Sequence, residues 1–132
     1  MDFWCPARNP DAMSISRETA KNPEDLTRLF VERVNAGDVE GLVALYEPTA
    51  VMAYPPGSIT EGADAIRALF EQMLAGRPRF PQERPLPTLR CGDIALTSTS
   101  ALDGTGGRAQ VVRRQADGSW KRIIDRPESA SA

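Results

Sequence analysis

The chain has 132 residues, of which 41% are hydrophobic and 26% charged, and these values are typical of one globular domain. Its formal charge is −2 and its basic residues are scattered, which argues against nucleic acid as a partner. It contains no histidine, which excludes a Ser–His–Asp triad, a Cys–His pair and the usual imidazole metal sites. Acid/base chemistry in this chain therefore falls to carboxylates, tyrosine or lysine.

The location and cofactor needs of the chain follow from what its sequence lacks. No stretch approaches the about 18 consecutive apolar residues of a membrane span, and residues 1–12 lack the apolar core of a secretory signal. We therefore expect a soluble, cytoplasmic protein with no membrane contact. The acidic residues are too dispersed for an oxygen-ligated metal site, and we expect no metal and no cofactor. Cys5 and Cys91 form no CxxC motif; between one long-range disulfide and two free thiols, we expect the thiols.

Regular structure is predicted to begin after an N-terminal arm. We expect residues 1–21 to be this flexible arm. The run 22–25 (NPED) is typical of a helix start, with a capping Asn, Pro in the first helical position and acidic residues in the first turn. Apolar residues then recur at helical spacing until Gly37 closes the helix.

Two further helices are predicted in the first half of the chain. Asp38 is placed to cap a second, shorter helix that includes Tyr46 and is ended by Pro48. Residues 50–54 (AVMAY) predict a short strand. The third helix stops at Gly76 and carries the clearest amphipathic stripe of the chain, formed by Ile66, Leu69, Phe70, Met73 and Leu74.

After residue 76 the pattern changes from helices to strands. Four prolines between residues 78 and 87 allow an edge strand or an extended loop but no central strand. Strands are predicted over residues 94–102, 108–115 and 120–126. Asp117-Gly118 forms a hairpin turn between the last two. Because helices come first and hairpin strands last, we predict the α+β class, with a cone-like roll of helices packed on a curved antiparallel sheet that encloses a pocket.

Several of these segments together resemble a known superfamily. Residues 30–42 (FVERVNAGDVEGL) and the closing runs VVRR, DGSW and IID resemble the nuclear transport factor 2-like superfamily, in its branch of SnoaL-like polyketide cyclases and ketosteroid isomerases. The resemblance spans residues 22–127 and leaves the arm and a polar tail at 128–132 outside the domain. Members include isomerases, cyclases, epoxide hydrolases and scaffolding domains, so the resemblance implies a fold and a pocket rather than one reaction.

The resemblance also implies which residues occupy the site. Phe30, Tyr54 and Gln110 stand where ketosteroid isomerases have an oxyanion-binding Tyr, a general-base Asp and a second oxyanion donor, so that mechanism is excluded. SnoaL-like cyclases have an acid/base Asp on the final strand, seven residues after the hairpin Gly, and this position is Asp125. Limonene epoxide hydrolases have an Arg and two Asp residues at positions that are here Arg108, Gln110 and Asp125.

Asp125 is therefore the predicted catalytic residue, with Tyr54, Arg108, Gln110, Phe30 and Ile123 as predicted substrate-binding residues. Because side chains alternate along a strand, Ile123 and Asp125 are expected to share one face and Arg122 to lie on the other. On that basis Asp125 would be a lone carboxylate among apolar residues, where burial favours the protonated form. The alternative is a structural role, in which Asp125 forms an ion pair with Arg108 or Arg126.

Three functions remain open at this point. The first is a cofactor-independent enzyme of the cyclase, isomerase or hydrolase type that uses Asp125 on a polyketide-like molecule. The second is a pocket that binds a small apolar ligand without catalysis. The third is a dimerising scaffold domain. We also expect a homodimer formed through the outer face of the sheet, with this face carrying Thr97, Thr99, Val111, Arg113 and Trp120.

Overall fold

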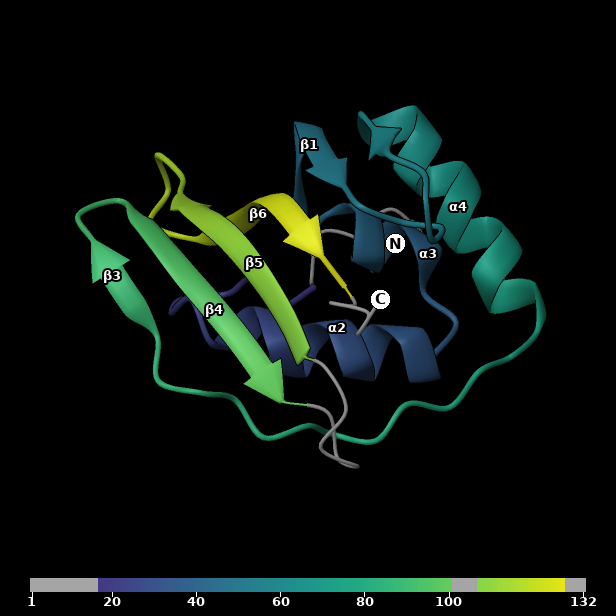
Figure 1. Ribbon diagram of the computed structural model, residues 1–132, viewed down its shortest axis with the longest axis horizontal. Helices are drawn as coiled ribbons and strands as arrows, with labels where there is room; N and C mark the ends of the chain where they lie inside the picture. Colours follow the sequence, from purple (N-terminus) through teal and green to yellow (C-terminus); the bar gives the residue numbers. More distant parts are fainter. Residues whose placement is uncertain (1–16, 101–106, 128–132) are drawn as a thin grey trace, which may run out of the picture.

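The computed structural model describes residues 17–100 and 107–127. Its helices are α2 (Asp25–Asn35), α3 (Val39–Val43) and α4 (Ala63–Ala75). Its strands are β1 (Tyr46–Met52), β2 (Thr60–Glu61), β3 (Leu89–Cys91), β4 (Ile94–Ser100), β5 (Gly107–Arg114) and β6 (Trp120–Arg126). The sheet curves across α2, and α4 lies beside the end of the sheet that β1 and β2 form (Figure 1). This arrangement is the predicted α+β cone.

All six strands form one sheet in the order β2-β1-β6-β5-β4-β3. Neighbouring strands are antiparallel except β1 and β6, which run parallel. The sheet is therefore mixed rather than wholly antiparallel. A parallel pair needs a long connection between its strands, and here α4 and four further strands lie between β1 and β6 in the chain.

The helices begin and end close to the expected residues. Asp38 caps α3, since its Oδ1 accepts a hydrogen bond from the Gly41 N–H at 3.0 Å. Gly37 before it has a φ of +69°, which favours glycine. The prediction that Tyr46 belongs to the second helix is wrong, because this helix ends at Val43 and Tyr46 opens β1. Pro48 lies inside β1 between Tyr46 and Val51, where the pairing with β6 shifts register.

Residues 17–21 are part of the folded body, so placing them in a flexible arm is wrong. Ala20 is buried, and its carbonyl accepts a hydrogen bond from the Trp120 N–H at 2.9 Å. The Arg33 guanidinium donates to the Glu18 carbonyl. The rest of the expected arm, the tail at 128–132 and the last two residues of the strand predicted over 94–102 lie outside the described residues. Cys91 is exposed and carries a free thiol, while Cys5 is not described.

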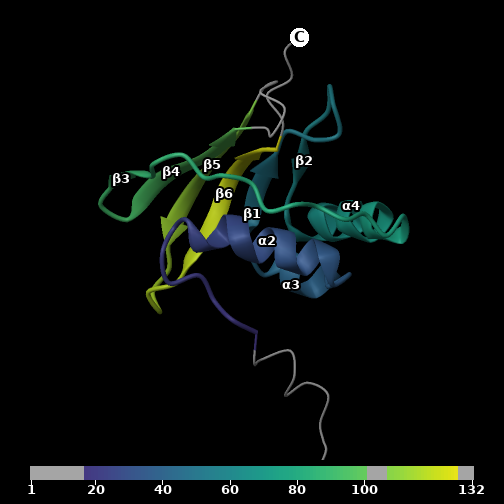
Figure 2. The ribbon, with the colours of Figure 1, turned by 90° about the horizontal axis from the view of Figure 1, so that it is seen from below.

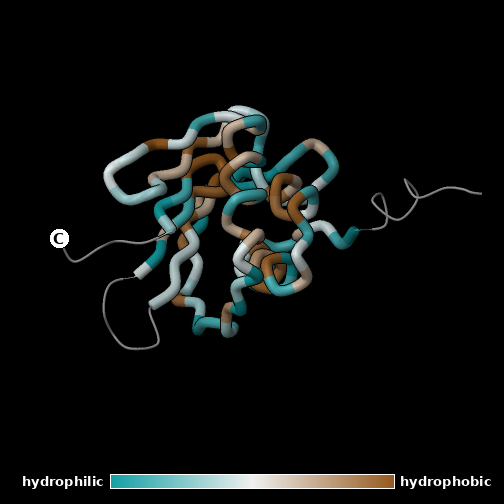
Figure 3. The backbone as a smooth tube through the Cα atoms, turned by 90° about the vertical axis from the view of Figure 1, so that its right-hand side faces the viewer, coloured by the Kyte–Doolittle hydropathy of each residue, from teal (hydrophilic) through white to brown (hydrophobic). Residues whose placement is uncertain are grey.

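The core lies between α2, α4 and the concave face of the sheet (Figure 2). Its largest fully buried side chains are Phe70, Leu26, Leu29, Leu42, Ile66, Val34 and Val112. Hydrophobic stretches of the chain gather where the helices meet the sheet (Figure 3). No helix among residues 17–100 and 107–127 is long and apolar enough to cross a membrane.

The two faces of the sheet differ from the expected assignment. Thr97, Thr99 and Trp120 are buried rather than on the outer face. The reason is the phase of the alternation in β4, which turns Ala95, Thr97 and Thr99 toward the helices and leaves Leu96 outside.

Candidate functional site

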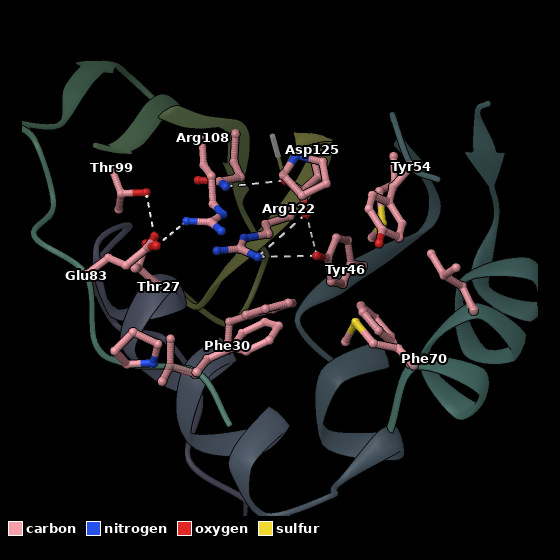
Figure 4. Close-up of a pocket in the computed structure, with 18 residues that line it drawn as sticks. Thr27, Phe30, Tyr46, Tyr54, Phe70, Glu83, Thr99, Arg108, Arg122 and Asp125 are labelled. Carbon is pink, nitrogen blue, oxygen red and sulfur yellow. Dashed lines mark hydrogen bonds and ion pairs between the residues drawn. The ribbon is translucent and has the colours of Figure 1, made fainter. Parts of the chain in front are cut away.

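A pocket of about 200 Å³ opens between α2, α4, the concave face of the sheet and the proline-rich segment after α4. Its walls are mostly apolar and include Phe30, Met52, Phe70, Met73 and Phe80. Polar and charged groups enter it at a few positions, most of them on the strands and the proline-rich segment (Figure 4). Such a hollow, apolar with a few polar groups, is typical of a small-molecule site.

Asp125 lies on the floor of this pocket and is only 2% exposed. The Tyr46 hydroxyl donates a hydrogen bond to its Oδ2 at 2.5 Å, and the Gln110 Nε2 donates to its Oδ1 at 3.3 Å. Thr97 donates to the Gln110 Oε1 at 2.8 Å, which orients the amide so that its N–H group faces Asp125. Asp125 is therefore not the lone carboxylate that we expected.

Arg122 supplies the positive charge beside Asp125. Arg122 is 3% exposed, and its Nη1 donates to the Tyr46 hydroxyl at 3.2 Å and lies 3.7 Å from the Asp125 Oδ2. It also lies over the Phe30 ring, 5.0 Å from the centroid. Its Nε is buried without a hydrogen-bond partner in the described part of the chain. The alternative prediction, an ion pair of Asp125 with Arg108 or Arg126, is wrong in its partners, because Asp125 forms the ion pair with Arg122.

Burial and charge set the protonation of this cluster. Burial, and then the nearby Asp125 carboxylate, raise the pKa of the Tyr46 hydroxyl well above its ordinary value, so Tyr46 stays a neutral donor. Burial alone would lower the pKa of Arg122, but Tyr46 and Asp125 outweigh it and raise that pKa. Arg122 is therefore a fixed cation at the pocket floor.

A β-bulge explains why Arg122 and Asp125 face the same way. Val111 pairs with Ile124 and Val112 pairs with Arg122, so Ile123 is an extra residue on β6. The bulge reverses the alternation, and residues 122 and 125 both turn inward. Ile123 does not line the pocket, so its assignment as a substrate-binding residue is wrong.

A second charged cluster lies at another part of the pocket wall. Arg108 forms an ion pair with Glu83, whose Oε1 also accepts a hydrogen bond from the Thr99 hydroxyl at 3.2 Å. Glu83 comes from the proline-rich segment. The described contacts of Arg108 thus give it Glu83 as a partner rather than Asp125, and the Arg–Asp pairing of epoxide hydrolases is not formed here.

Five predicted residues line this one pocket, namely Phe30, Tyr54, Arg108, Gln110 and Asp125. Sequence reasoning missed Tyr46, Arg122 and Glu83. No sequence pattern marked Glu83, which lies in a segment expected to be an edge strand or a loop. Arg122 was expected on the face of the last strand opposite Asp125. Among the described residues, no group of three or more Cys, Asp or Glu side chains is placed to hold a metal ion.

Comparison with known proteins decides the family. Residues 27–123 match the SnoaL-like domain, which is most of the chain. The chain belongs to the SnoaL-like domain family. This confirms the resemblance read from the sequence, although Asp125 lies two residues beyond the matched range. No curated protein matches this SnoaL-like domain closely.

Solved structures show that the fold is shared by proteins with different names. A candidate calcium/calmodulin-dependent protein kinase type II association domain from Thiobacillus denitrificans has a TM-score of 0.68 at 19% identity, over 84% of this chain and 98% of that one. A ketosteroid isomerase-like protein from Erwinia carotovora atroseptica has a TM-score of 0.63 at 16% identity, over 81% and 93%. A candidate dehydratase of the NTF2-like family from Streptomyces avermitilis has a TM-score of 0.62 at 17% identity, over 79% and 92%. At these identities the likeness is one of fold.

Proposed function

We propose that this SnoaL-like domain binds a small, mainly apolar carbonyl compound and that Asp125 removes a proton from it. The observation that carries the proposal is the pairing of a buried carboxylate and a buried guanidinium on the floor of an otherwise apolar pocket. A cavity of about 150 Å³ is enough to hold benzene. A pocket of about 200 Å³ therefore fits a substituted ring, or one ring of a larger polyketide-like molecule that extends through the mouth.

The residues of the floor suggest how the reaction proceeds. Asp125 accepts a proton from the carbon next to the carbonyl, and the electron pair moves to the carbonyl oxygen to form an enolate. Among the described residues its Oδ1 has one contact, the long 3.3 Å hydrogen bond from Gln110, and it keeps lone pairs for this proton. Arg122 stabilises the enolate oxygen as a fixed cation. If a C=C bond is conjugated with the enolate, return of the proton from Asp125 to the far carbon of that bond gives isomerisation. Attack of the enolate carbon on a second carbonyl gives cyclisation, and the proton on Asp125 then goes to the alkoxide that forms.

The names of the fold relatives agree with an acid/base enzyme and with one alternative function. Dehydration, like isomerisation, is acid/base chemistry, and one relative is named as a candidate dehydratase. Another is named as a candidate association domain. The second candidate function, a non-catalytic association domain, is favoured by the apolar residues on the outer face of the sheet, including Leu96 and Ile124.

Proton removal is measurable without knowing the natural substrate. The protein is incubated in D₂O with 4-phenylbutan-2-one or 1-tetralone, and loss of the α-proton signal is followed by NMR. We expect exchange faster than in buffer, and a decrease of about 10²- to 10⁴-fold in Asp125→Asn, the range that general-base catalysis supplies. Asp125→Glu, which keeps a carboxylate, should retain part of the rate. Asp93→Asn, at an exposed ion pair outside the pocket, is the matched control.

Two results would contradict the proposal. One is exchange no faster than in buffer for either ketone. The other is an unchanged rate in folded Asp125→Asn. Thermal unfolding of each variant, recorded beside the exchange rate, separates loss of the base from loss of the fold.

A further inference from the structure

The ion pair between Arg108 and Glu83 is not used by the proposed reaction. Arg108 points into the pocket. Glu83 and Thr99 lie on one side of the pocket, and Asp125 and Tyr46 lie on the other (Figure 4). The Arg108 side chain is 36% exposed and that of Glu83 is 16% exposed, so the pair is in contact with water at the pocket mouth. The pocket therefore has two charged ends with an apolar space between them.

This ion pair is well suited to exchange with a ligand. Arg108 is on β5, whereas Glu83 lies outside the helices and strands. The segment that contains Glu83 is held to the sheet by an isolated bridge between Pro85 and Thr99. The ion pair is partly exposed, so water screens it and its contribution to stability is small. Releasing Glu83 into water is therefore a small loss for the fold.

The Arg108 guanidinium also has N–H donors beyond the one that contacts Glu83. A guanidinium has five N–H donors and binds carboxylates best through two parallel hydrogen bonds. In the described structure the contact from Arg108 to Glu83 is made through Nη1. Of the charged groups lining the pocket, Asp125 and Arg122 compensate one another at the floor, which leaves Arg108 and Glu83 as the exchangeable pair.

We propose that the ligand of this pocket carries a carboxylate, which replaces Glu83 on Arg108. The apolar body of the ligand then fills the space beside Phe30 and Phe70, and its carbonyl group lies at Arg122 and Asp125. The ligand class is an oxo acid with a ring or a short apolar body. Glu83 acts as a built-in competitor that holds Arg108 while the pocket is empty. This inference rests on the proposed function, because it uses the same pocket and the same reacting carbonyl.

A matched pair of probes tests the charge requirement directly. The full chain is titrated with 4-oxo-4-phenylbutanoate and with its primary amide, and binding is followed by the backbone amide signals of Thr99, Gln110 and Asp125. We expect the carboxylate to bind at least about tenfold more tightly, which is the value of hydrogen bonds to a charged group. Arg108→Gln should remove this preference. Glu83→Gln should strengthen binding of the carboxylate several-fold and leave the amide within about twofold.

Matched controls come from an ion pair of the same kind outside the pocket. Arg114→Gln on the same strand and Asp93→Asn break an exposed pair and should bind both probes like the original protein. Equal binding of both probes, or a preference that survives Arg108→Gln, would overturn the anionic ligand and leave the pocket proposal standing. Weaker carboxylate binding in Glu83→Gln would overturn the competitor role. If neither probe binds, both proposals fail.

Discussion

At the scale of single residues, Arg122 determines what Asp125 is able to do. The two are nearly fully buried, and both contact the Tyr46 hydroxyl. A buried charge is costly to keep unless a partner compensates it. Arg122 therefore supplies the counter-charge that a carboxylate buried at the Asp125 position needs. The expectation that Asp125 is isolated among apolar residues is wrong, because Tyr46, Gln110 and Arg122 contact it.

The pairing predicts strong coupling between these two residues. Asp125→Asn leaves the Arg122 cation buried without its counter-charge, and Arg122→Met leaves the carboxylate in the same state. Each single change should lower the free energy of unfolding by about 3 kcal/mol or more. The double variant should lose clearly less than the sum, because it removes both charges. Urea unfolding of the four proteins measures this, and additive losses would show that the pair is not coupled.

Which site residues were predictable depended on the regularity of their strand. Asp125, Arg108 and Gln110 were found through the resemblance to SnoaL-like cyclases and epoxide hydrolases, whose site residues lie on regular strands of the closing hairpin. Ile123 and Arg122 were exchanged because nothing in the sequence of β6 marks the bulge, and one extra residue reverses every side chain beyond it. Tyr46 was missed because its hydrophobic spacing fits the end of a helix as well as the start of a strand.

At the scale of elements, the outer face of the sheet carries a continuous apolar row. Leu89, Leu96, Val111, Ile124 and Val51 lie directly opposite one another on five neighbouring strands. Leu89 is 64% exposed and Ile124 is 52% exposed. Cross-strand neighbours share one face, so these side chains form one patch. Such a patch on an open sheet is typical of a surface that binds a partner.

We propose that this row is covered by the same row of a second copy, giving a homodimer through the sheet. Light scattering after size exclusion at tens of micromolar should give twice the mass of one chain. Leu96→Glu and Ile124→Glu should give the monomer mass, because a charge then lies in the interface. Ile59→Glu is the matched control, since Ile59 is 70% exposed but lies outside the row. A monomer mass for the original protein would contradict the dimer.

At the scale of the whole molecule, the order of the helices and strands was more predictable than the way the segments outside them pack onto the domain. Caps, stop signals and hairpin turns placed the three helices and the last three strands near their observed bounds. The docking of residues 17–21 and the position of the proline-rich segment depend on contacts between distant parts of the chain. Such contacts leave no local periodicity, which is why Glu83 entered the site only with the structure.

The structure of the protein with 4-phenylbutan-2-one bound tests the central claim most directly, because it shows where the carbonyl lies. We predict the ketone oxygen within about 3.2 Å of an Arg122 nitrogen, a hydrogen-bond distance, and the adjacent carbon next to the Asp125 carboxylate. The phenyl ring should lie between Phe30 and Phe70. A ketone bound with its oxygen directed away from Arg122, or bound outside the pocket, would contradict the assignment of Asp125 as the base.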